Sequence, residues 1–235
     1  MFGLTVLTAP RFARGKLGLC HAPQRAANVG FEGLVGEAWT RLPIAIRARF
    51  QGHIQAGNPR HYVGQIMTTK LTIWGQLLAY LLLPFGAPLP LRQSQGGEAA
   101  HVTVSADPTH TSPHAQIWTR NYGTTKGLPQ IIHTTKCFEG PTGLEERLGK
   151  GLGRFIGMSL RLEVGVNALH FISTRFFCLM FGHKVWLPKW MEPGQMIVTH
   201  EAVTEDQFIF RLNLTHPCFG LLVEQACQFE DTKEI

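Results

Sequence analysis

The feature that most constrains the fold is a strict alternation of apolar and polar side chains, clearest between residues 207 and 215. Every second position there is apolar: Phe208, Phe210, Leu212 and Leu214. Because side chains of a β-strand point alternately to its two faces, these four residues share one face. The pattern predicts a half-buried antiparallel strand in which Phe210 is buried and Arg211 faces solvent.

Segments of the same kind, separated by Gly and Pro, continue from His101 to Phe229. The predicted strands are residues 101–106, 115–122, 129–138, 144–148, 156–164, 169–179, 184–187, 196–203, 208–215 and 219–229, with an earlier strand at 61–69. Short loops between consecutive strands favour an antiparallel meander over parallel βαβ units. We therefore expect eight or more antiparallel strands.

Two segments before this series have a helical pattern. In the first, an apolar residue recurs every three or four positions: Val35, Trp39, Leu42, Ile46 and Phe50. Pro43 lacks a backbone donor, so we expect a kink or a second helix that begins near it. The second predicted helix, Trp74 to Leu83, lies in the longest apolar stretch, which is too short to cross a bilayer and ends at Pro84.

These elements predict an α+β fold, with N-terminal helices packed on a large, curved, mostly antiparallel sheet that is partly closed like a barrel. A sheet of this kind, with a helix across its open side, tends to enclose an apolar cavity. We expect a basic, loosely ordered arm over residues 1–30 and a single domain over residues 31–235.

The net charge of +6 comes from the N-terminal region, because residues 1–60 carry eight Lys and Arg against two Glu. We interpret this region as a solvated arm and expect no nucleic-acid partner and no transmembrane segment. The five cysteines are widely spaced and form no CxxC pair: Cys20, Cys137, Cys178, Cys218 and Cys227. This usage is typical of reduced thiols and predicts a cytoplasmic protein.

Several short motifs carry a resemblance to a known family. They are Trp118-x-Arg120-x-Tyr122-Gly123, Leu144-Glu145-Glu146-Arg147-Leu148-Gly149, Leu187-Pro188-x-Trp190-x-x-Pro193 and His216-Pro217-x-Phe219-Gly220. In this order the chain resembles an uncharacterised family, the domain of unknown function 4166, over roughly residues 34–229. Members also occur fused to saccharopine-dehydrogenase-like domains, so the resemblance implies an association with an oxidoreductase.

The candidate ligand-binding residues are three that share one strand face, Trp118, Arg120 and Tyr122, together with Glu145 and Glu201. A guanidinium between two aromatic rings can present its planar fork to a carboxylate or phosphate. The favoured alternative is an outward face on which Arg120 pairs with a neighbour such as Glu145 or Glu146. If the face points inward, Arg120 needs a buried partner, either Glu145 or Glu201 or an anionic ligand.

Catalytic residues are unknown from the sequence. Glu145, Glu201, His200 and Arg161 provide acid–base chemistry only if they converge on one pocket. No nucleophile elbow or catalytic cysteine context accompanies them, so we lean toward a protein that is not an enzyme. The glycine-rich segment Gly149–Gly153 lacks the Ser or Thr that follows the lysine of a phosphate-binding loop, and we expect no cofactor.

A metal site is also not expected. Four candidate ligands lie within fourteen residues, namely His101, Asp107, His110 and His114. Pro113 prevents the last two histidines from sharing a helical face, and no zinc-binding spacing is present. The apolar loop around Trp186 and Trp190 is either the rim of a pocket, an element that touches a membrane or, as we favour, a loop that its aromatic residues pin to the core.

The function that these observations favour is a non-catalytic module that binds a small apolar, lipid-like or anionic ligand, as an accessory to an oxidoreductase. Two alternatives stay open: an enzyme with an Arg/Glu site in the cavity, and a protein-interaction domain that docks through its basic N-terminal region. An enclosed apolar cavity with few polar groups favours binding, converging carboxylates with raised pKa values favour catalysis, and a filled interior favours interaction.

Overall fold

The computed structural model describes residues 30–86, 88–123, 129–139, 143–149 and 154–232, and its strands all belong to one antiparallel sheet. The strands are β1 (Arg60–Leu71), β2 (Ala99–Ala106), β3 (Gln116–Tyr122), β4 (Gln130–Glu139), β5 (Gly143–Leu148), β6 (Ile156–Val164), β7 (Ala168–Met180), β8 (His183–Trp186), β9 (Gln195–Ala202), β10 (Gln207–His216) and β11 (Gly220–Asp231). The predicted antiparallel meander is confirmed. The predicted arm lies outside the described residues except for Gly30, as do residues 150–153 of the glycine-rich segment.

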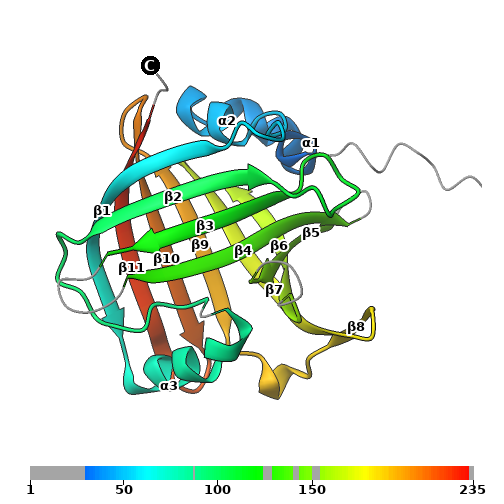
Figure 1. Ribbon diagram of the computed structural model, residues 1–235, viewed down its shortest axis with the longest axis vertical. Coiled ribbons are helices and arrows are strands. Elements are labelled where there is room, and N and C mark those ends of the chain that lie inside the picture. The colour runs from blue at the N-terminus through cyan, green and yellow to red at the C-terminus, as the bar shows by residue number, and fades with distance from the viewer. Residues whose placement is uncertain (1–29, 87, 124–128, 140–142, 150–153, 233–235) are drawn as a thin grey trace, which may run out of the picture.

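The sheet closes into a barrel. Neighbouring strands follow the order β6-β5-β4-β3-β2-β1-β11-β10-β9-β7-β8, and β6 also pairs with β7. Ten strands therefore form a ring, and β8 extends only β7 (Figure 1). Closure leaves these ten strands with paired neighbours on both sides, which removes the exposed edges of an open sheet.

The long strand β7 pairs with β6 along one edge and with two different strands along the other edge. Its first part, Ala168–Ile172, pairs with β9 inside the ring, whereas Phe177–Met180 pairs with β8. The hairpin of β7 and β8 therefore projects from the barrel wall at one end of the molecule (Figure 1).

Short helices lie at the two ends of the barrel (Figure 1). One end carries α1 (Phe31–Val35), the 3₁₀ helix η2 (Gly36–Arg41) and α2 (Ile44–Phe50). Pro43 is the N-cap of α2, as the sequence predicts for a helix that begins beside it. The opposite end carries α3 (Ile73–Leu81), η3 (Leu83–Phe85) and η5 (Lys189–Met191).

Helix α3 lies directly against β11 at a glycine. A Cβ atom at Gly75 would lie 2.0 Å from the carbonyl oxygen of Leu222, so no larger residue fits at this contact. Thr72 caps the helix by accepting a hydrogen bond from the backbone N–H of Gly75 at 3.2 Å. The backbone N–H of Thr72 also donates to the carbonyl oxygen of Leu222 at 3.1 Å, which ties the start of α3 to β11.

The inward faces of the strands follow the predicted alternation. On β10, Phe208, Phe210, Leu212 and Leu214 are buried, whereas Arg211 is partly exposed and pairs with Glu201. Within the described ranges, the four cysteines are free thiols. No helix in this part of the chain is both long enough and apolar enough to span a bilayer.

Candidate functional site: a cavity in the barrel

The interior of the barrel contains a cavity of about 360 Å³ on the side of α3. Inward side chains of eight strands and the covering segments line it, and most of these side chains are apolar, including Leu78, Leu82, Met158, Phe176, Met196 and Leu212. A volume of this size lies within the range of small-molecule pockets. Among the described lining residues, only Arg120 and Glu146 are charged.

The charged residues form a buried cluster on three adjacent strands. Lys136 on β4 lies directly opposite Glu146 on β5, and its Nζ is 2.8 Å from one carboxylate oxygen. The guanidinium of Arg120 on β3 is 3.8 Å from the other carboxylate oxygen and donates to the hydroxyl of Thr134 at 3.1 Å. All three charged side chains are at least nine-tenths buried, so each depends on the others for compensation.

Burial and mutual attraction act in opposite directions on these groups. Burial alone would raise the pKa of Glu146, but Lys136 and Arg120 outweigh it and hold that pKa below its usual value. Burial lowers the pKa of Lys136, and Glu146 opposes this effect. Glu146 is therefore an ionised ion-pair partner and is poorly suited to act as a general acid.

The mouth of the cavity has an apolar rim. Leu81 of α3 and Met191 of η5 line the cavity and are also largely exposed. Trp190 beside them is 81% exposed, so it does not pin its loop to the core as favoured from the sequence. The rim interpretation fits this loop better, because Leu187 and Met191 both line the cavity.

The other half of the barrel is filled with aromatic rings. Phe31 of α1 and Phe50 of α2 enter the barrel from the end, with ring centroids 5.2 Å apart. His200 of β9 lies among the rings of Phe50, Trp118, Phe171, Phe208 and Phe210, at centroid distances of 5.0–5.8 Å. Neither ring nitrogen of His200 has a hydrogen-bond partner among the described residues.

His200 is consequently a neutral core residue. Burial lowers its pKa well below 6.5, and the nearby cations Arg49, Lys136 and Arg120 lower it further. The structure shows no carboxylate beside it with which it could form an acid–base pair in the described residues. Arg161, the other candidate for such chemistry, pairs with Glu163 at the surface.

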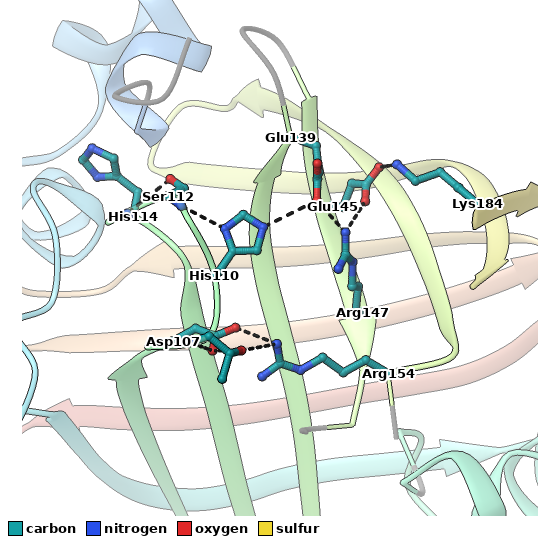
Figure 2. Close-up of polar contacts among 10 residues, drawn as sticks. Asp107, His110, Ser112, His114, Glu139, Glu145, Arg147, Arg154 and Lys184 are labelled. Atoms are coloured by element: carbon teal, nitrogen blue, oxygen red, sulfur yellow. Dashed lines mark hydrogen bonds and ion pairs between the residues drawn. The ribbon is translucent and has the colours of Figure 1, made fainter. Parts of the chain in front are cut away.

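A second polar network lies outside the cavity and is balanced in charge (Figure 2). Arg154 contacts Asp107 at 2.6 Å, and Arg147 contacts Glu139 at 2.5 Å and Glu145 at 3.4 Å. Lys184 of β8 completes the network by pairing with Glu145. Three cations therefore meet three carboxylates, so this network is self-compensating.

Three of the four predicted metal-ligand candidates take part in ordinary polar contacts. Asp107 pairs with Arg154, His110 with Glu139, and His114 with the carbonyl oxygen of Gly52 (Figure 2 shows the first two pairs). Within the described ranges, no group of three His, Cys, Asp or Glu side chains could hold a metal ion.

Comparison with known proteins gives the family. Residues 42–229 match the family described as "Domain of unknown function (DUF4166)", which is well over half of the chain. The chain belongs to this family. The DUF4166 match spans every strand of the barrel, from β1 to all but the end of β11.

Other comparisons add little to this assignment. The chain is similar to the crystal structure of Rv2717c from M. tuberculosis, with 11% sequence identity and a TM-score of 0.41, over 82% of this chain and 99% of that chain. No curated protein matches this DUF4166 chain.

In this DUF4166 barrel, the predicted face of Trp118, Arg120 and Tyr122 points inward, so the favoured outward interpretation is wrong. Their exposed fractions are 3%, 6% and 4%. Arg120 and Tyr122 line the cavity, whereas Trp118 lies in the aromatic layer against Phe50.

The prediction that Glu145 or Glu201 is the inward partner of Arg120 is wrong. Glu145 lies on the outer face of β5, where Lys184 and Arg147 surround it. Glu201 lies on the outer face of β9 and pairs with Arg211 at 3.1 Å. The physical reason is alternation: Glu145 and Glu201 each adjoin an inward residue, Glu146 and His200, and so must point outward.

Sequence reasoning missed Lys136 and the inward position of Glu146, although signals for both were present. Glu146 alternates with Leu144 and Leu148, two apolar residues that mark the inward face of β5. Lys136 alternates with Ile132 and Phe138 in the same way on β4. A charged residue in phase with an apolar face is therefore the signal that identifies this buried cluster.

Proposed function

We propose that this DUF4166 barrel is a non-catalytic binding module for a small apolar, lipid-like molecule held in the cavity. The observation that carries the proposal is a predominantly apolar cavity inside a closed barrel, with only a few polar groups grouped at one place. Pockets that bury most of a ligand are typically built in this way, with few polar groups that orient it.

The charge state of the cavity supports binding over catalysis. The described lining residues include one carboxylate, Glu146, and its pKa is lowered by Lys136 and Arg120 despite burial. Acid–base catalysis by two carboxylates needs a second one and a separation of their pKa values. The apolar rim at Leu81 and Met191 supports an opening suited to an apolar molecule.

Native mass spectrometry of the purified chain tests the proposal. We expect a mass excess that denaturing conditions remove and that an organic extract of the same sample contains. Leu212→Trp, which places a larger side chain in the cavity, should abolish the excess. Ile209→Trp, on the same strand but its other face, is the matched control and should retain it.

Two results would contradict the proposal. One is a chain that carries no small molecule and takes up no alkyl probe. The other is a Leu212→Trp variant that carries the same molecule in the same amount as the parent. The association with an oxidoreductase and the cytoplasmic location stay predictions, which co-purification from cells and fractionation would check.

A further inference from the structure

The charged cluster at the cavity has more positive than negative charge. Arg120 and Lys136 are both buried beside one carboxylate, that of Glu146. The outer network differs, because its three cations meet three carboxylates. An excess charge in a buried site is unfavourable unless a counter-charge reaches it.

The geometry shows which cation is available. Lys136 is in close contact with Glu146 at 2.8 Å and is not part of the cavity wall among the described residues. Arg120 does line the cavity, and its contact with Glu146 is longer, at 3.8 Å. A guanidinium has five N–H donors in a fixed fork, of which one donates to Thr134. Arg120 is therefore the cation that can accept a further anionic partner from the cavity.

We propose that the ligand is an amphiphile with a single carboxylate, which Arg120 binds at the polar end of the cavity while the apolar tail points toward α3. This proposal rests on the proposed function, and it names the class of ligand. One negative charge balances the cluster of two cations and one anion. A planar carboxylate also matches the fork of Arg120, which can bind it through two parallel hydrogen bonds.

Calorimetric titration with three probes that share one tail tests the proposal. The probes are dodecanoate, dodecanol and dodecylamine, added to the full chain at neutral pH below their micellar concentrations, after extraction of any bound lipid. A charge-assisted hydrogen bond in a buried site predicts that dodecanoate binds about tenfold or more tightly than dodecanol. Dodecylamine should bind most weakly of the three, because it adds a cation to a site that is already positive.

Three variants locate the head group. Arg120→Gln should lower the ratio of dodecanoate to dodecanol affinity to about one. Arg120→Lys should retain part of the preference, because it keeps the charge and loses the fork. Arg211→Gln is the matched control, since Arg211 lies on the outer face of β10, and should leave the ratio unchanged. The ratio is informative even if a variant is less stable, because both probes need the same cavity.

The outcomes separate the two proposals. If the parent binds dodecanoate and dodecanol equally, or Arg120→Gln keeps the preference, the carboxylate proposal is wrong and the apolar binding function stands. If the parent binds none of the three probes, the proposed function itself is wrong.

Discussion

The two halves of the barrel are built from the same strands, but one is filled and the other is hollow. At the end capped by α1 and α2, Phe31 and Phe50 enter the barrel and pack against Phe171, with exposed fractions of 0–1%. At the end capped by α3, the covering helix contributes Leu78 and Leu82 to a cavity wall. A barrel of about eight strands is just wide enough for its own side chains to fill it. A ring of ten strands therefore needs side chains from outside the sheet, and the end capped by α1 and α2 is filled by two fully buried rings, those of Phe31 and Phe50.

The largest loss of stability is expected when one aromatic ring is removed from each half, and the two losses together test the comparison. Phe50→Ala should lower the free energy of unfolding by about 3–5 kcal/mol, because the surrounding rings cannot close the gap. Phe176→Ala should cost less, about 1–3 kcal/mol, since the Phe176 ring already borders the cavity and has fewer contacts to lose. Denaturant unfolding of both variants checks the difference. Equal losses would mean that the two halves are packed alike.

The next largest loss of stability is expected from the charged cluster of Arg120, Lys136 and Glu146, which lies at the border of the two halves. Glu146→Leu leaves Arg120 and Lys136 without their shared carboxylate and should cost about 3 kcal/mol. Adding Lys136→Met to this variant should restore part of the loss, because it removes one unpaired cation. The same denaturant experiment on the single and double variants measures the coupling. A double variant less stable than Glu146→Leu would argue against the ion pair.

His200 makes the filled half sensitive to pH. The fold keeps its imidazole neutral, because burial lowers its pKa well below 6.5, whereas the unfolded chain binds a proton near that pH. Stability should therefore fall as the pH falls below 6.5, by at most about 1.4 kcal/mol per pH unit from this residue. The difference in the free energy of unfolding between the parent and His200→Phe, measured between pH 7 and pH 5, isolates the contribution of His200, since the other histidines are common to both. A constant difference across this range would show that His200 takes up its proton at the same pH in the fold as in the unfolded chain.

The smallest effect belongs to the outer face. Arg211→Ala should cost under about 1 kcal/mol, because its contact with Glu201 is partly exposed to water. The neighbouring change Phe210→Ala should cost about 3–5 kcal/mol in the same denaturant experiment, because the Phe210 ring borders the cavity but also packs against His200 in the filled half. Comparable losses would mean that the inward and outward faces of β10 are wrongly assigned.

Much of the barrel was predictable because a strand pattern is local. Each predicted strand corresponds to an observed one, including the short β8, and the break at Pro43 separates η2 from α2. The sequence named Glu146 as a partner of Arg120 only for an outward face, whereas the structure pairs the two on the inward face. Alternation indicates that Glu146 points inward, yet it does not say which strand lies beside β5.

The sequence by itself determined the number of strands, their antiparallel order and which side chains share a strand face, because a period of two is visible within each segment. The tertiary structure decided the rest. The pairing of β6 with β7 closes the ring, and strand register places Lys136 opposite Glu146 with Arg120 nearby. Two helices fill one end and leave a cavity at the other. These are relations between segments far apart in the chain, set by register, ring width and packing, and no local pattern contains them.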